Sequence, residues 1–357
     1  MTATMNAAID LLDSQVLADI RAHAGALDRG EHTTRRSFAA LGAAGLLGVG
    51  APGNADGRLP QMAEVIRLIS GECMSTGFSV WASRMTIEYL LTAATPLSEM
   101  TARPLLAGTA LGVTGMAAAF KEAAGCGSLE LTAARVVGGY LLSGSIRWAS
   151  NLYDDSLLVT AARTERGDKL IVALPFFLNA PGVTVGEHFK LLAMDSTASS
   201  YLELKDVYVA DEQVLSTDFT GFLDAVRPTF LVLQSAMCIG LARTTLTQTR
   251  IGLTGVNSVF TPDVDLIEGK LALAETTLAS LAGAVGGPRP PSRKELLSLR
   301  LTAAEIASAS AALEIRTAGG KGYASRTPAS RRYREAAFIP VQSPSEAQLR
   351  WELGGCP

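Results

Sequence analysis

A glycine-rich segment near the end of the chain is a candidate for presenting side chains to a ligand. Residues 318–328 read Ala-Gly-Gly-Lys-Gly-Tyr-Ala-Ser-Arg-Thr-Pro and follow an alanine-rich helical pattern. Gly319 and Gly320 should break that helix, because glycine enters positive φ without steric cost. An ordered loop between helices can present side chains such as Tyr323 and Arg326 to a small molecule. The alternative is an ordinary helix end followed by a polar turn.

This segment resembles the C-terminal loop of the acyl-CoA dehydrogenase family, which reads Gly-Gly-x-Gly-aromatic, then Glu, Pro and Arg-Asp-Ala. The positions that fit this pattern without a gap are Gly319, Gly320, Gly322, Tyr323, Pro328 and Arg334-Glu335-Ala336. The resemblance implies that Gly319 and Gly320 contact a flavin, and that Tyr323 contacts the substrate. Arg326 stands where the family usually has its catalytic glutamate. It could pair with an anionic group of the substrate or be a solvated loop arginine.

A second segment, residues 143–151, reads Ser-Gly-Ser-Ile-Arg-Trp-Ala-Ser-Asn. It resembles the family segment Gly-x-Lys-x-Trp-Ile-Thr-Asn, in which the tryptophan flanks the isoalloxazine ring and the hydroxyl bonds flavin N5. The resemblance implies these roles for Trp148 and Ser150. The residue types suit them, since an indole can cover one face of a flat ring and a short hydroxyl can donate or accept one bond. The alternative is a hairpin end with a buried tryptophan.

Further segments match the family less completely. Gly127 and Ser128 resemble the end of its Thr-Glu-Pro-x-x-Gly-Ser-Asp motif, and the backbone of such a turn can cradle a flavin edge. Ser345 lies where the family has Glu-Gly-Thr, so it is a further cofactor-binding candidate. The resemblance also places three residues at the wall of the substrate cavity, with core packing as the alternative for the two aromatic ones: Phe78, Trp81 and Arg227.

The usual catalytic base is missing from both positions where the family carries it. Arg326 occupies one, and Val226, directly before Arg227, occupies the other. Neither side chain can take the α-proton that acyl-CoA dehydrogenation removes, since the pKa of arginine exceeds about 12. Asp224 and Glu122 are the carboxylates close to these segments in sequence. The family's Arg-x-x-Phe-Gly element, which contacts the FAD diphosphate of a neighbouring subunit, has no clean match in 250–260.

Three functions agree with these motifs. The first is an FAD-dependent oxidoreductase of the acyl-CoA dehydrogenase type, acting on an acyl-CoA or similar thioester. The second is a flavin-dependent monooxygenase on the same fold, which needs no α-proton base. The third is a non-catalytic family member that acts as a binding subunit. The resemblance implies an electron-accepting flavoprotein or a flavin reductase as partner, and a homotetramer or homodimer.

Composition supports a helical protein with large cores. The chain has 357 residues, of which 48% are hydrophobic and 18% charged, and its formal net charge of −3 makes nucleic acid an unsuitable partner. The four cysteines, Cys73, Cys126, Cys238 and Cys356, form no CxxC pair and suggest free thiols in a reducing cytoplasm. With three histidines, a histidine-rich metal site is not expected. We expect no membrane-spanning helix, because no apolar run is long enough.

The elements follow in the order helices, strands, helices. Apolar residues recur at helical spacing over 1–107, short β-type runs separated by turns fill 108–215, and helical patterns return over 216–357. These three ranges are the predicted domains. The fold expected is mainly α with a central β domain, a small barrel or sandwich, as in the acyl-CoA dehydrogenase family.

Residues 33–47 allow two interpretations. They contain Arg35-Arg36 followed by Phe38 and a weakly apolar run, a pattern similar to a twin-arginine export signal. They also match the family's N-terminal helix and turn, which ends near Pro52. Their position more than thirty residues into the chain favours the second interpretation and a cytoplasmic protein.

Overall fold

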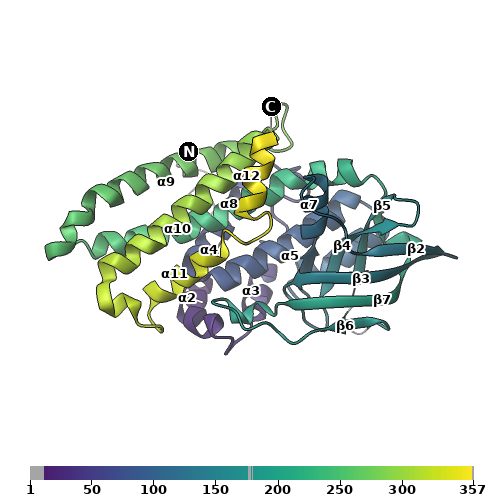
Figure 1. The fold of residues 1–357 in the computed structure, drawn as a ribbon, viewed down its shortest axis with the longest axis horizontal. Helices are drawn as coiled ribbons and strands as arrows, with labels where there is room; N and C mark the ends of the chain where they lie inside the picture. The colour runs from purple at the N-terminus through teal and green to yellow at the C-terminus, as the bar shows by residue number, and fades with distance from the viewer. Residues whose placement is uncertain (1–11, 176–177, 179, 356–357) are drawn as a thin grey trace.

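The computed structural model describes residues 12–175, 178 and 180–355. Helices form one side of the molecule and a twisted sheet forms the other (Figure 1). The N-terminal helices are α2 (Ser14–Asp28), α3 (Phe38–Ala43), α4 (Leu59–Glu72), α5 (Met74–Ala93) and α6 (Pro96–Leu106). The C-terminal helices are α8 (Phe219–Ile251), α9 (Thr261–Ala284), α10 (Arg293–Tyr323), α11 (Pro328–Phe338) and α12 (Glu346–Gly355). This order confirms the predicted fold class.

The strands, which come between the two sets of helices in chain order, form one mixed sheet. Its eight strands are β1 (Gly112–Gly115), β2 (Thr132–Val136), β3 (Gly139–Ala149), β4 (Leu157–Thr164), β5 (Lys169–Pro175), β6 (Val183–Val185), β7 (Ser200–Ala210) and β8 (Val214–Ser216). The order is β6-β7-β3-β2-β4-β5-β8, and β1 pairs in parallel with β4. A short helix, α7 (Ala117–Ala123), follows β1 inside the range predicted as β structure.

Local sequence explains where several helices begin. Thr95 caps α6 in a reciprocal capping box with Ser98, and Ser292 caps α10 in the same way with Glu295. Asp218 caps α8 through the Gly221 N–H. Such caps satisfy backbone N–H groups that have no partner within the helix.

The predicted glycine break is shorter than expected. Gly319 has φ 61° and ψ −153°, which interrupts α10, but the helix resumes and continues to Tyr323. Thr327 then caps α11, and Pro328 occupies its first turn, where a missing N–H costs least. The loop between the two helices is therefore limited to 324–327.

The arginine pair near the N-terminus is bonded to other parts of the folded protein. Arg35 binds Asp155 and the Thr109 carbonyl, and Arg36 binds Asp19. The apolar residues that follow the pair, Phe38 among them, are buried in the main hydrophobic core. These contacts agree with the interpretation of 33–47 as a structural helix and turn.

Helices from both ends of the chain share that core. α8 packs against α4, α5 and α10, and the core cluster extends from the N-terminal helices to Leu349 in α12. α8 and α10 are long and apolar enough to cross a membrane by length and composition. Of their most apolar windows, 89% and 61% respectively is buried inside the protein, as in core helices.

α5 is the central helix of this arrangement, buried continuously from Met74 to Leu90. Its charged residues Arg84 and Glu88 form a fully buried ion pair of 2.8 Å. The Glu88 carboxylate also accepts hydrogen bonds from the Gly53 N–H at 2.7 Å and from the Thr229 hydroxyl of α8 at 3.0 Å. The Arg84 guanidinium donates to the Val49 carbonyl at 3.2 Å. This network ties α5 to α8 and to the 49–53 turns.

We expect Arg84→Met to lower the free energy of unfolding by about 3–5 kcal/mol, because it leaves the Glu88 carboxylate charged and buried without its partner. Chemical denaturation measures the change. Glu346→Gln, which removes an exposed partner of Arg350, is the control and should cost less than about 1 kcal/mol. A similar small loss in both variants would show that the buried network does not hold the helices together.

Candidate active site

The wall of the candidate site on α5 is aromatic. The Phe78 and Trp81 rings stack at 5.6 Å, and both side chains are more than nine-tenths buried. Trp81 meets Phe230 of α8 edge-on at 5.0 Å, and Phe78 meets Phe338 of α11 at the same distance. One rigid cluster therefore joins three helices that are far apart in the sequence.

The end of β3 supplies the opposite wall. Asn151 is fully buried with φ 63°, and its side-chain amide donates to the carbonyls of Ser79 in α5 and Gly112 in β1, both at 3.0 Å. This anchor fixes the preceding residues against α5. Ser150 shares a 2.7 Å hydrogen bond with the Ser199 hydroxyl, while Trp148 is half exposed with its ring 4.6 Å from Phe189.

These walls enclose a largely apolar cavity of about 490 Å³. We call it the aromatic cavity. Its lining residues come from α5, β1, α7, β3, the 191–193 segment, α8, α11 and the connection to α12: Phe78, Trp81, Ala82, Thr114, Ala117, Lys121, Trp148, Ala149, Ser150, Leu191, Leu192, Ala193, Phe230, Arg334, Ala337, Phe338, Val341, Gln342 and Ser343. Among the described residues that line it, none is an aspartate or a glutamate.

Buried polar groups at this cavity have no partner within the described protein. They are the indole N–H of Trp81, the side-chain nitrogen of Gln342 and the hydroxyl of Ser343. Trp81 and Gln342 are at most 5% exposed. Burying an N–H group without an acceptor is costly, so such groups are expected to meet a ligand or water. Flat aromatic walls with unpaired donors fit a planar heteroaromatic group that carries carbonyl oxygens, as a flavin ring does.

The structure brings four of the predicted site residues together at this cavity, namely Phe78, Trp81, Trp148 and Ser150. Arg227 does not line it. Its guanidinium is buried against Glu352 at 2.9 Å and lies over the Phe120 ring, so it joins α8 to α12.

The remaining cofactor and substrate candidates lie elsewhere on the chain. Gly127 and Ser128 are in an exposed turn after α7, and Tyr323 is 82% exposed. Gly319 and Gly320 form the interrupted end of α10, and the Ser345 hydroxyl accepts from the Gln348 N–H at the start of α12. None of these six residues lines the aromatic cavity in the described structure.

Neither carboxylate suggested as a replacement base faces the cavity. Asp224 is exposed on α8, and Val226 beside it is buried in the core. Glu122 instead binds Arg163 at 2.6 Å and Lys169 at 2.9 Å. Partial burial acts to raise its pKa, but the bonds from Lys169, Arg163 and the Leu129 N–H together lower the pKa of Glu122 to about 2. A carboxylate held in this way is a very weak base.

Several lining residues were not predicted from the sequence, among them Thr114, Lys121, Phe230 and Phe338. Thr114 follows Val113 in β1, directly before a helix, and a search for a short strand there would have found it. Phe230 and Phe338 look like ordinary apolar helix positions. Only the crossing of α5, α8 and α11 brings their rings together.

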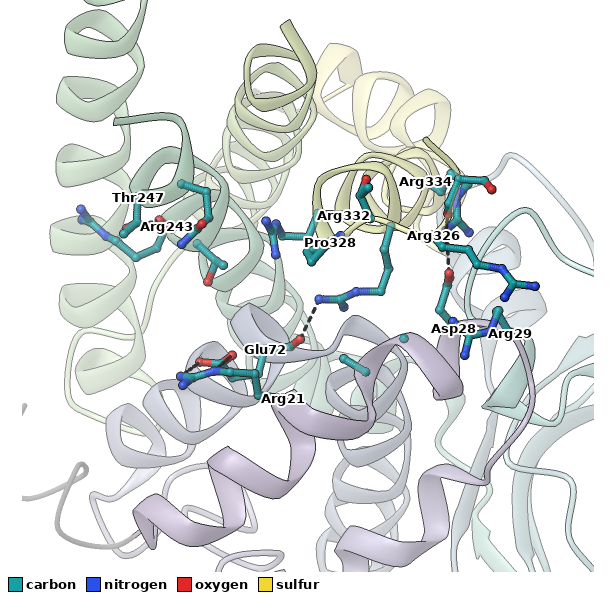
Figure 2. Close-up of a pocket in the computed structure, with 17 residues that line it drawn as sticks. Arg21, Asp28, Arg29, Glu72, Arg243, Thr247, Arg326, Pro328, Arg332 and Arg334 are labelled. Carbon is teal, nitrogen blue, oxygen red and sulfur yellow. Dashed lines mark hydrogen bonds and ion pairs between the residues drawn. The ribbon is translucent and has the colours of Figure 1, made fainter. Parts of the chain in front are cut away.

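Arg326 lines a second cavity, of about 600 Å³ (Figure 2). We call it the arginine cavity. It is lined by Arg21, Ala24, Gly25, Asp28, Arg29, Glu72, Arg243, Thr244, Thr247, Gln248, Ser325, Arg326, Thr327, Pro328, Arg331, Arg332 and Arg334. Arg334 lines both cavities and donates to the Asp28 carboxylate at 2.7 Å and to the Leu192 carbonyl at 3.0 Å.

Comparison with known proteins identifies relatives of this chain, although no protein-family model matches it. The short-chain specific acyl-CoA dehydrogenase of mouse (Mus musculus) is 25% identical over 64% of the chain. The benzylmalonyl-CoA dehydrogenase of Aromatoleum aromaticum is 25% identical over 89% of the chain. The aligned regions span 58% of the mouse enzyme and 88% of the bacterial one.

Solved structures share the fold over the whole chain. Butyryl-CoA dehydrogenase from Megasphaera elsdenii superimposes with a TM-score of 0.86 at 17% identity, over 99% of this chain and 98% of that one. KijD3, solved in complex with FMN and a dTDP-linked amino sugar, gives 0.79 at 18% identity, over 99% and 93%. The chain is thus related to the acyl-CoA dehydrogenases, which are flavin-dependent oxidoreductases, and the resemblance seen in its motifs is confirmed.

The charge on Glu122 should make stability depend on pH. We expect Glu122→Gln to lower the free energy of unfolding at pH 7 by about 1–3 kcal/mol, the range for hydrogen bonds to charged groups. Because the folded-state pKa of about 2 lies below the unfolded-state value, wild type loses this advantage as pH falls from about 4.5 toward 2.

Urea denaturation at pH 7 and pH 3 measures the difference between wild type and variant. Glu165→Gln, in the exposed β4–β5 turn, is the control and should change little at either pH. An equal loss at both pH values for Glu122→Gln would contradict an ionic role of this carboxylate.

Proposed function

We propose that this protein is a flavin-dependent oxidoreductase that holds FAD at the aromatic cavity and acts on an acyl-CoA or similar thioester. The observation that carries the proposal is the convergence of Trp148 and Ser150 with the Phe78–Trp81 pair around unpaired buried donors. The relationship to acyl-CoA dehydrogenases supports the substrate class.

Residues of this chain would have distinct tasks there. A bound flavin would supply the hydride-accepting centre of the reaction. Trp148 would cover one face of the ring, and Ser150, held in place by its hydrogen bond to Ser199, would present its hydroxyl at the ring edge. The aromatic cluster of α5, α8 and α11 would exclude water and limit the space open to a long acyl chain.

The missing carboxylate supports a second candidate function, a flavin-dependent monooxygenase. Removal of an α-proton requires a base, and no described lining residue of the aromatic cavity carries a carboxylate. Oxygen chemistry on a reduced flavin needs no such base, and a flavin reductase would then be the partner in place of an electron-accepting flavoprotein. The third candidate function is that of a non-catalytic family member with the same fold, which acts as a binding subunit.

An absorbance spectrum of the purified full-length protein with added FAD tests the proposal. We expect wild type to bind the flavin and Trp148→Ala to bind it about tenfold or more weakly, since stacking against an indole is lost. Val137→Ala changes an exposed residue of the β2–β3 turn and is the control. If wild type does not bind flavin, both enzymatic functions are excluded, and the non-catalytic binding subunit is the candidate function that is left.

Anaerobic addition of acyl-CoA esters to the same sample distinguishes the dehydrogenase from the monooxygenase. Bleaching of the flavin band supports the dehydrogenase. Oxygen consumption that depends on a separate flavin reductase, without bleaching, supports the monooxygenase.

We also propose that the protein is cytoplasmic and forms a homo-oligomer through its C-terminal helices. Leu266 and Leu273 lie seven residues apart on α9, so they share one helix face, and both are exposed. α9 itself lies at the outer edge of the helical part (Figure 1). Exposed leucines on one face of an amphipathic helix favour burial against a second copy.

Light scattering after size exclusion measures the oligomeric state. We expect wild type to elute as a dimer or tetramer and Leu273→Arg to reduce the mass to that of a smaller species, because a charge would be buried at the interface. Val137→Arg places the same charge on an exposed apolar residue of the β2–β3 turn, away from the C-terminal helices, and should leave the mass unchanged. A monomeric wild type would refute the proposal.

A further inference from the structure

We propose that the arginine cavity is a binding site for a small molecule that carries a diphosphate group, and that Arg326 is its principal ligand-binding cation. Seven of the residues that line the cavity are arginines, against one aspartate and one glutamate. Arginine presents a planar fork of donors that matches phosphate oxygens. The cavity shares only Arg334 with the aromatic cavity, so this site does not depend on the proposed flavin site.

Arg326 differs from the other six arginines in having no bonded partner. Each of the six donates to a carboxylate: Arg21 to Glu72, Arg29 to Glu31, Arg243 to Glu275, Arg331 to Glu335, Arg332 to Glu314 and Arg334 to Asp28. Within the described part of the chain, Arg326 has no hydrogen bond or ion pair of its own. Its charge is felt at Glu31, where the Arg29 hydrogen bond and, more weakly, Arg326 hold the pKa of the carboxyl below its usual value. The guanidinium is thus available to an incoming anion.

Three of the six pairs show which arginines are fixed and which can exchange their partner. Arg331 pairs with Glu335 and Arg332 with Glu314 in the protein interior, where all four side chains are at most 9% exposed. These two arginines are therefore fixed parts of the cavity wall. Arg29 pairs with Glu31 at the surface, where both side chains are more than a third exposed. Exposed ion pairs contribute little to stability, so Arg29 can exchange Glu31 for phosphate oxygens at small cost.

Figure 2 shows how the cations are arranged around the cavity. Arg326 from the loop before α11 and Arg29 from the end of α2 lie on the same side, next to the Arg334–Asp28 pair. They come from segments almost 300 residues apart in the sequence. Two guanidinium groups from different elements can bind two phosphate groups of one ligand.

The size of the cavity indicates more than an inorganic ion. About 600 Å³ lies within the range of roughly 300–1,000 Å³ that is usual for small-molecule sites. Thr244 and Gln248 of α8 also line the cavity and offer neutral hydrogen-bonding groups, and Arg243 and Thr247 of the same helix lie on the side away from Arg326 (Figure 2). This arrangement suits a diphosphate at the Arg326 side with an attached organic group extending toward α8.

Isothermal titration calorimetry of the full-length protein at low ionic strength tests the proposal, with pyrophosphate, ADP, AMP and citrate as probes. We expect pyrophosphate and ADP to bind, and AMP to bind about tenfold or more weakly than ADP. Arg326→Ala should weaken ADP binding about tenfold or more, because a charge-assisted hydrogen bond is lost. Arg29→Ala should weaken it as well.

Two controls test whether a loss of binding comes from unfolding or from the loss of any arginine. Arg326 is exposed, so Arg326→Ala should fold, and circular dichroism checks this. Arg135→Ala removes an arginine of β2 that pairs with Asp211 outside the cavity and should bind ADP as wild type does. Failure of wild type to bind pyrophosphate or ADP at millimolar concentration, equal affinity of wild type and Arg326→Ala, or citrate binding as tight as that of pyrophosphate would each overturn the assignment. FAD titration of the same variants shows whether the flavin site still binds FAD, so that failure of the diphosphate proposal can be distinguished from failure of the proposed flavin site.

Discussion

The complete burial of α5 is the constraint on which the rest of the structure depends. The charged groups of a helix that is covered on nearly every side need partners inside the protein. Arg84 and Glu88 meet this requirement by reaching the 49–53 turns and Thr229 of α8. From the sheet side, Asn151 binds the Ser79 carbonyl of the same helix. One helix therefore sets the positions of the N-terminal turns, of α8 and of the end of β3.

The aromatic cavity is a consequence of that arrangement. Trp148 and Ser150 lie next to α5 because Asn151, which follows them directly, is anchored to it. Phe230 and Phe338 close the other side because α8 and α11 pack on the same helix. The site is thus built from side chains whose positions are fixed by buried contacts, which is the rigidity that binding a flat cofactor requires.

Charge is distributed unevenly between the two cavities. The aromatic cavity has Lys121 and Arg334 but no carboxylate among its described lining residues, whereas the arginine cavity gathers seven arginines. Arg326 lines the second cavity.

The sequence alone determined the order of helices and strands and the motif around Trp148, because these depend on local periodicity and on spacing within short segments. It also predicted Phe78 and Trp81 near the substrate. It could not show whether Arg227 binds a ligand or, as in the structure, pairs with Glu352. Nor could it show that Arg163 and Lys169 both form ion pairs with Glu122. Those partners lie 41 to 125 residues away. Only the packing of distant elements decides which charges neutralise each other, since electrostatic interactions depend on distance in space and on burial.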